Sequence, residues 1–201
     1  MEFKFKFTDR ERFIRLLEAD LSNIKVERKY MDIDGFINHL EEGGFFTSPC
    51  STQYHLAEEG GLLKHSLNVE SIIMDLHGAI DFSNKNINYF QASLVALLHD
   101  VGKMGQFGKR LYIENYLSDG VRSSRKPYIT NFDLLNIDHE IRSINIITRF
   151  IDLTEEETFA ILYHNGMYAN SRYALKGHET PLQMLLHFAD MWASRVTEKE
   201  E

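Results

Sequence analysis

Apolar residues recur along most of this chain at the three- to four-residue spacing of an amphipathic α-helix. Over 9–21, for example, Phe13, Leu17 and Leu21 fall near a 3.6-residue period. The same spacing returns in several later stretches, separated by polar loops such as 43–60. It predicts further helices over about 32–42, from Gly61 through Leu76, and over 86–101, 138–151, 154–164 and 181–196.

Three local signals mark where these helices begin and end. Gly43-Gly44 is a stop signal for the helix before it. Thr154, followed three residues later by Glu157, has the form of a capping box at a helix start. Pro181 suits the first turn of the last long helix, where its missing N–H costs no hydrogen bond. The helices are therefore expected to be separate elements joined by loops.

The stretch 104–136 breaks the helical pattern. Tyrosine and isoleucine alternate with turn residues such as Gly120 and Pro127, which predicts a small β-hairpin or an irregular flap. Phenylalanine and lysine alternate over 3–7, and this segment is read either as a strand that pairs with the flap or as an exposed arm. The fold class expected is all-α, a helical bundle with this insertion.

Length and composition favour one globular domain with a helical extension before it. At 201 residues, with 43% hydrophobic and 26% charged residues, the chain can bury a substantial core. We expect residues 1–45 to form an N-terminal helical extension packed on the core, 46–196 the main domain and 197–201 a polar, frayed tail.

Charge and cysteine content exclude several classes of protein. A net charge of −8 argues against binding to long nucleic acid, which needs many contacts from Lys and Arg to phosphate. The single cysteine, Cys50, excludes an internal disulfide and a thiolate-rich zinc module. No apolar run is long enough for a membrane span, and the first residues do not resemble a secretory signal. We therefore expect a cytoplasmic protein that binds no membrane; a homo-oligomer remains open.

Six residues of metal-ligand type lie in apolar stretches of different predicted helices. Polar side chains on apolar helix faces must be paired or coordinated, because burying them alone is costly. A helical bundle brings such positions together in its core. Imidazole and carboxylate ligands suit a divalent transition metal. The six candidates are His65, His99, Asp100, His139, His164 and Asp190.

The order and surroundings of these residues resemble the HD-domain superfamily of metal-dependent phosphohydrolases. The resemblance covers about 45–196 and combines four elements, and the combination is far more specific than any single element. These are Gly60-Gly61-Leu62-Leu63-Lys64-His65-Ser66-Leu67, His99-Asp100-Val101-Gly102-Lys103, His139-Glu140-x-x-Ser143 and His187-Phe188-Ala189-Asp190.

The resemblance implies an HD-domain helical bundle over 46–196 and two divalent transition metal ions, drawn from Mn, Fe, Ni, Co and Zn. It implies hydrolysis of a phosphate monoester or diester by a metal-bound hydroxide. Asp100 would bridge the ions, so it counts as catalytic as well as a ligand. The implied ligands of the first ion are His65, His99, Asp100 and Asp190, and those of the second are Asp100, His139 and His164.

Four further residues are candidates for contacts with the substrate. Lys103 is expected to hold a phosphate or stabilise charge in the transition state; a lysine interacting with a helix dipole is the alternative. Arg195 is either a phosphate contact or a solvated surface residue. Tyr54 and His55 lie in the loop before His65 and either border the pocket or face solvent. The basic and aromatic residues over 104–136 favour a small phosphorylated substrate, most simply a nucleotide.

Three rival functions use the same residues. A di-iron oxygenase of HD type would hold iron in the same cage. A 3′-5′ exonuclease would act on short oligonucleotides, although the acidic balance of the chain counts against it. A non-catalytic module would keep the metal only to bind a ligand.

Overall fold

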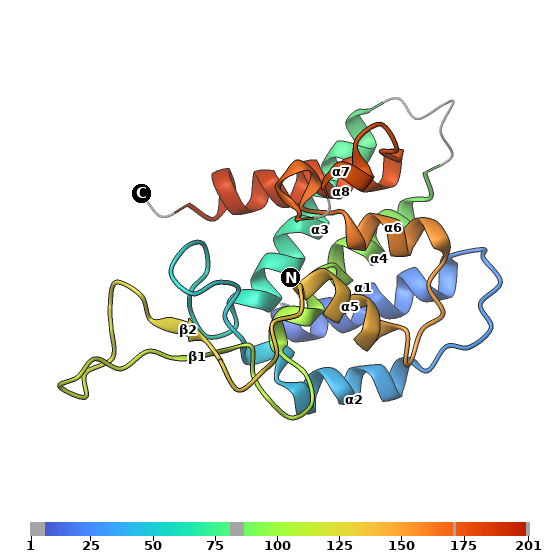
Figure 1. Cartoon of the computed structure of the whole chain (residues 1–201). Helices are drawn as coiled ribbons and strands as arrows, with labels where there is room; N and C mark the ends of the chain where they lie inside the picture. The colour runs from blue at the N-terminus through green and yellow to red at the C-terminus, as the bar shows by residue number, and fades with distance from the viewer. Residues whose placement is uncertain (1–6, 81–86, 171, 200–201) are drawn as a thin grey trace, which may run out of the picture.

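The computed structural model describes residues 7–80, 87–170 and 172–199, and shows a mostly helical protein with one small β-hairpin (Figure 1). The fold class expected from the pattern is confirmed. The α-helices are α1 (Asp9–Asn23), α2 (Ile33–Gly43), α3 (Gly61–Ala79), α4 (Tyr89–Leu98), α5 (His139–Ile147), α6 (Glu155–Leu162), α7 (Arg172–Leu175) and α8 (Pro181–Trp192). The shorter elements are η1 (Phe45–Thr47), η2 (Val101–Met104), η3 (Gly166–Tyr168), η4 (Ala193–Thr197), β1 (Tyr112–Glu114) and β2 (Tyr128–Thr130).

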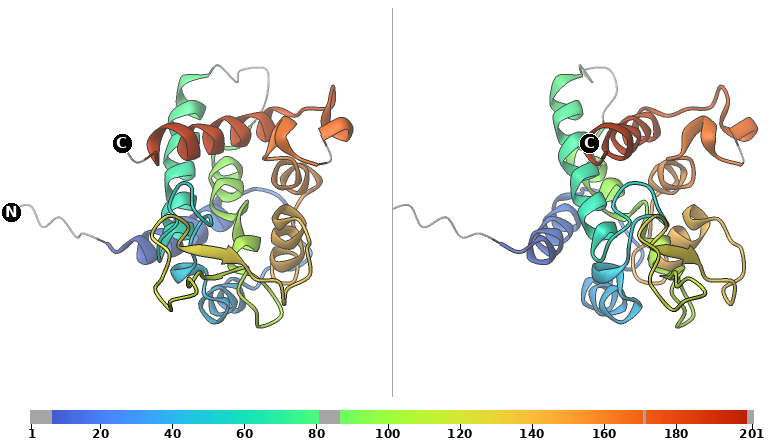
Figure 2. Two further views of the ribbon diagram at one scale, coloured as in Figure 1. Left: turned by 60° about the vertical axis from the view of Figure 1, so that its left-hand side comes forward. Right: turned by 90° about the vertical axis from the view of Figure 1, so that its left-hand side faces the viewer.

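Helix α4 is the centre of the bundle. It packs against α1, α3, α6 and α8, and Figure 2 shows it enclosed by these helices. All residues from Ala92 to Leu98 are buried, which fits a helix that is apolar on every side. The apolar faces of α1 and α2 join the same hydrophobic core through residues such as Phe13 and Phe36. The end of α4 is therefore held deep in the protein.

The predicted helix ends are largely confirmed. The Thr154 side chain accepts a hydrogen bond from the Glu157 N–H, and the Glu157 carboxylate accepts one from the Thr154 N–H, completing the capping box of α6. Pro181 lies in the first turn of α8. Gly44 ends α2 in the left-handed conformation, with φ of 74°.

Several helix ends differ from the prediction. Helix α5, predicted to reach 151, already stops at Ile147. The helix predicted over 86–101 stops at Leu98, so His99 and Asp100 lie in the turn that follows. Helix α8 passes directly into the π-helical turn η4, which ends at Thr197. This turn lets Glu198 fold back into the protein, although a frayed tail was predicted from 197 onward.

The predicted flap contains a two-stranded antiparallel sheet in which Ile113 pairs with Ile129. The hairpin is anchored to the loop before α3, because the Tyr128 N–H donates to the Thr52 carbonyl at 3.2 Å. The segment 3–7 lies outside the described residues except for Phe7. No helix in the described part of the chain is both long and apolar enough to cross a bilayer.

Candidate metal centre

The six predicted ligands meet at one place in the core, although they come from five segments of the chain. His65 lies in α3, His99 and Asp100 follow α4, His139 begins α5, His164 follows α6 and Asp190 lies in α8. Within overlapping groups of three, their ligand atoms lie within 4.8 Å of one another. The structure thus brings together a His/Asp cluster that could hold a metal ion, as the sequence predicted.

The Asp100 carboxylate divides the cluster into two halves. Its Oδ2 lies 3.4 Å from Nε2 of both His65 and His99. Its Oδ1 lies 3.2 Å from Nε2 of His139 and 3.5 Å from Nε2 of His164. Asp190 belongs to the first half, because its Oδ1 lies 3.2 Å from His65 Nε2. Each carboxylate oxygen of Asp100 therefore faces a different pair of imidazoles.

Each histidine is oriented through its other ring nitrogen. His99 Nδ1 lies 2.8 Å from the Ala96 carbonyl, and His164 Nδ1 lies 2.8 Å from the Ile161 carbonyl. Since a carbonyl only accepts, these Nδ1 atoms carry the proton and donate it. The Nε2 atoms are left with a lone pair that points to the cluster. This is the arrangement of histidines that bind metals.

The centre contains buried polar atoms without hydrogen-bond partners among the described residues. They include Nε2 of His65, Nε2 of His99 and both oxygens of Asp100, although Lys103 forms an ion pair with Asp100. Unsatisfied buried polar atoms cost free energy, and several converging on one point are unusual. Imidazole nitrogens and carboxylate oxygens match the ligands of divalent transition metals, so the residues present fit such an ion.

The electrostatics of the centre indicate an excess of negative charge. Burial opposes ionisation of Asp100, but the ammonium of Lys103 beside it holds its pKa well below the ordinary value. Burial likewise opposes protonation of His65, yet Cys50 and the surrounding carboxylates raise its pKa well above the ordinary value. Burial lowers the pKa of His164 to about 3, which keeps this imidazole neutral. A cation is favoured beside Asp100, and a neutral ligand is ready at His164.

The turn after α4 explains how neighbouring residues reach the same point. Consecutive side chains on an α-helix diverge by roughly 100°. His99 keeps helical angles, with φ of −55° and ψ of −36°, but Asp100 leaves the helix with φ of −106° and ψ of 9°. This sparsely populated backbone region is common at active sites. The change of direction turns both side chains to the centre.

Gly102 places the helix that carries His139 against this turn. A Cβ at Gly102 would lie 2.2 Å from the His139 carbonyl oxygen and 2.7 Å from the Ser143 nitrogen. The Gly102 N–H donates a 2.8 Å hydrogen bond to the Ser143 hydroxyl. The glycine and serine singled out in the sequence thus set the distance between the two halves of the centre.

Glu198 is a site residue that the sequence did not indicate. It is only 8% exposed, and its two carboxylate oxygens lie 3.0 and 3.1 Å from His65 Nδ1. It also accepts a 2.9 Å hydrogen bond from the Asn68 side chain. Glu198 therefore orients His65 as the backbone carbonyls orient His99 and His164.

Lys103 is placed beside the cluster. Its Nζ lies 2.6 Å from Asp100 Oδ2, and the side chain is 14% exposed. Lys103 lies within the η2 turn, and its ammonium forms an ion pair with the central carboxylate of the cluster. His187, three residues before Asp190, contacts the site indirectly, with its Nδ1 2.8 Å from the His164 carbonyl.

The remaining predicted substrate residues surround hollows next to the cluster. Tyr54, His55 and Arg195 line one open hollow of about 470 Å³. Arg195 also lines a smaller one of about 80 Å³ that reaches Asp190, and its guanidinium lies 4.8 Å from the Tyr168 ring centroid. The structure thus brings these three residues together beside the centre. Tyr54 is 75% exposed, so its ring is free to stack on a ligand.

Comparison with models of protein families, with curated proteins and with solved structures finds no match to this chain. The likeness to HD-type sites therefore rests on the residues and geometry described above. At the level that this geometry supports, the protein is a helical protein with a buried His/Asp cluster that could bind metal.

Proposed function

We propose that this protein is a metal-dependent phosphohydrolase of HD type that acts on a nucleotide or a related small phosphate ester. The observation that carries the proposal is the position of Asp100, whose two oxygens face two separate pairs of histidines. Two divalent ions would be held on either side of it. When bound, such ions supply Lewis acidity and an activated water for attack on phosphorus.

The ligands would divide between the two ions according to their distances from the two Asp100 oxygens. His65, His99 and Asp190 are grouped around Asp100 Oδ2, and His139 and His164 around Oδ1. The Nε2 atoms of His99 and His164 carry lone pairs and their rings are oriented by hydrogen bonds at Nδ1, so they need no rearrangement to coordinate. A centre prepared in this way loses little entropy on binding metal.

Lys103 and Arg195 favour a phosphate substrate over oxygen chemistry. Lys103 places a buried ammonium at the bridging carboxylate, where it can donate to a phosphoryl oxygen and stabilise charge in the transition state. Arg195 lines both the hollow at Asp190 and the larger hollow beside His55, where its guanidinium can donate two hydrogen bonds to oxygens of a phosphate group.

The size and charge of the surroundings favour a small substrate. A hollow of about 470 Å³ accommodates a nucleotide-sized ligand, and the exposed Tyr54 ring offers a surface for base stacking. The net charge of −8 disfavours a long nucleic acid strand. The expected substrate is therefore a nucleotide, a cyclic nucleotide or a similar ester.

The test is a screen with protein loaded separately with Mn, Fe, Ni, Co or Zn, against nucleotides, cyclic dinucleotides and short oligonucleotides. Released phosphate and product mass are the readouts. Hydrolysis that is lost in Asp100→Asn and kept in Asp75→Asn, an exposed aspartate on α3, supports the proposal. Ladders from oligonucleotides would indicate the exonuclease, and oxygen uptake by iron-loaded protein the oxygenase. Ligand binding without turnover would indicate a non-catalytic module.

A further inference from the structure

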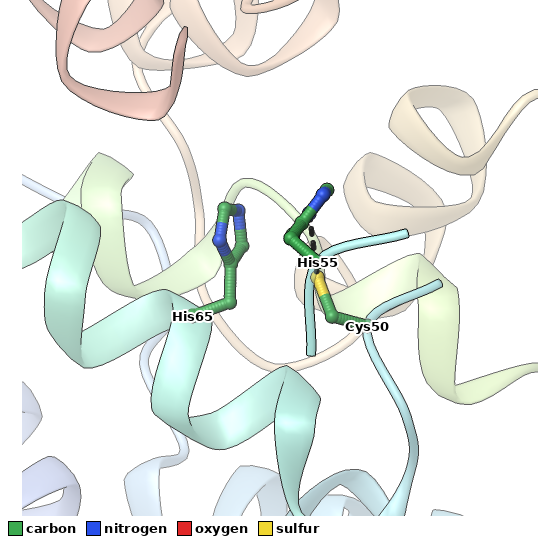
Figure 3. Close-up of side chains that lie close together, drawn as sticks. All are labelled: Cys50, His55 and His65. Carbon is green, nitrogen blue, oxygen red and sulfur yellow. Dashed lines mark hydrogen bonds between the residues drawn. The ribbon is translucent and has the colours of Figure 1, made fainter. Parts of the chain in front are cut away.

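A second group of metal-ligand type lies beside the centre and is made by Cys50, His55 and His65. Their ligand atoms lie within 4.8 Å of one another. Cys50 Sγ lies 3.4 Å from His55 Nε2, and the His55 and His65 ring centroids are 5.2 Å apart (Figure 3). Cys50 and His65 are buried and His55 is half-buried. Cys50 and His55 belong to neither half of the His/Asp cluster.

We propose that Cys50, His55 and His65 form a separate site for a soft divalent cation such as Zn²⁺ or Cd²⁺. In a tetrahedral zinc site, Zn–S is about 2.3 Å and Zn–N about 2.0–2.1 Å, which puts sulfur and nitrogen ligands roughly 3.6 Å apart. The 3.4 Å between Cys50 Sγ and His55 Nε2 is close to this spacing. On binding, the Cys50 thiol would lose its proton to solvent and coordinate as the thiolate.

The loop that carries Cys50 and His55 is built to hold them together. The Cys50 N–H donates to the Leu56 carbonyl at 3.1 Å, and the Ser51 hydroxyl donates to the His55 carbonyl at 2.8 Å. Leu56 has φ of 47°, a costly conformation for a leucine. A Cβ at Gly61 would lie 2.1 Å from the Leu56 carbonyl oxygen, so the loop sits directly on the start of α3. The two ligands are thereby fixed next to His65.

The ligand set distinguishes this site from the His/Asp cluster by chemistry. A thiolate with two imidazoles selects soft or borderline metals, whereas a site of imidazoles and carboxylates without sulfur also takes harder ions such as Mn²⁺. Lys103 Nζ lies 3.8 Å from Cys50 Sγ as well as 2.6 Å from Asp100. Mn²⁺ is therefore expected at the His/Asp cluster alone.

Sharing of His65 makes the two sites compete. Its Nε2 faces Asp100 and Asp190, and its Nδ1 bonds to Glu198. A cation held with Cys50 and His55 must take one of these nitrogens, and so either removes a ligand of the cluster or disrupts its orientation. The consequence, which rests on the proposed function, is that excess Zn²⁺ inhibits hydrolysis by the Mn²⁺-loaded enzyme.

Titration of the full chain with Co²⁺ and with Cd²⁺ tests the site without measuring activity. Wild type should develop a sulfur-to-metal charge-transfer band whose final amplitude corresponds to one metal–thiolate bond per chain. The band should be absent in Cys50→Ser. In His55→Gln it should appear only at higher metal concentration, because the affinity of the site for the metal should fall at least about tenfold. It should be unchanged in His178→Gln, an exposed histidine that serves as the matched control.

Two results would overturn the proposal: no such band in folded wild type, or a band that survives unweakened in His55→Gln. Circular dichroism of each variant separates loss of a ligand from loss of the fold. Asp100→Asn keeps Cys50, His55 and His65, so its band should persist. Failure of the proposed hydrolysis therefore leaves this test intact. Zinc inhibition that is equal in wild type and Cys50→Ser would overturn the competition between sites.

Discussion

Removing the Glu198 carboxylate should weaken metal binding without unfolding the protein. The two oxygens of Glu198 lie 3.0 and 3.1 Å from His65 Nδ1, and the side chain is almost completely buried. In Glu198→Ala, the Nδ1–H of His65 loses its acceptor, and the ring loses the contact that fixes its orientation. His65 is a proposed metal ligand, so the loss should appear in the affinity for metal.

The magnitude follows from the kind of hydrogen bond. A bond to a charged group contributes about 1.5–3 kcal/mol, and about 1.4 kcal/mol corresponds to a tenfold change in an equilibrium constant. We expect Glu198→Ala to weaken Mn²⁺ binding by about 10- to 100-fold, the range usual for partners of metal-bound histidines. Glu198→Gln keeps a neutral acceptor and should show a smaller loss.

Competition with a fluorescent chelator measures this affinity directly. Mn²⁺ is used because it is not expected to bind the proposed site of Cys50, His55 and His65. Lys199→Ala is the control, since its exposed side chain lies next to Glu198 but does not contact His65 in the described structure. Circular dichroism should show folded protein for each variant. Mn²⁺ affinity that is the same in Glu198→Ala and wild type would refute the inferred role of Glu198.

Three further predictions concern other parts of the structure. Burial raises the pKa of Asp20 from 3.8 to about 7, so the folded state binds this proton more tightly than the unfolded state. The Asp20 contribution to the free energy of unfolding should therefore fall by up to about 4 kcal/mol as pH rises from about 4 to 7, measured as the difference between urea titrations of wild type and Asp20→Asn. Gly102→Ala should lower the free energy of unfolding by about 1–3 kcal/mol and reduce the amount of bound Mn²⁺, because the new Cβ would clash with α5. Gly78→Ala is the control and should change neither quantity, since nothing lies within 4 Å of its Cβ. Arg195→Ala should raise KM for the best phosphate ester about tenfold while Mn²⁺ content stays constant; an unchanged KM would place Arg195 outside the substrate site.

The helices and the cluster could be predicted from the sequence because both depend on the local pattern of polar and apolar residues. A histidine or aspartate between leucines, as at His65 or Asp190, stands out from its apolar surroundings, and its burial is implied by them. The approximate positions of α1, α3 and α8 followed from the 3.6-residue period, which tertiary packing then reinforced.

Features set by tertiary contacts could not be predicted in this way. The apolar pattern resumes at Val101 after His99 and Asp100, so it gave no sign that the helix ends before His99. Close packing of Gly102 against α5 accompanies the turn. Glu198 lies among residues typical of a solvated tail, and only the η4 turn brings it to His65. Cys50 is a single cysteine in a loop, and its proximity to His55 and His65 depends on how that loop folds.

The most direct test of the account is the number of Mn²⁺ ions bound per chain, measured by equilibrium dialysis with elemental analysis. The position of Asp100 between two pairs of histidines predicts two Mn²⁺ ions in wild type and at most one in folded Asp100→Asn, with Asp75→Asn like wild type. One ion or none in wild type, or two ions in Asp100→Asn, would contradict the bridging role of Asp100.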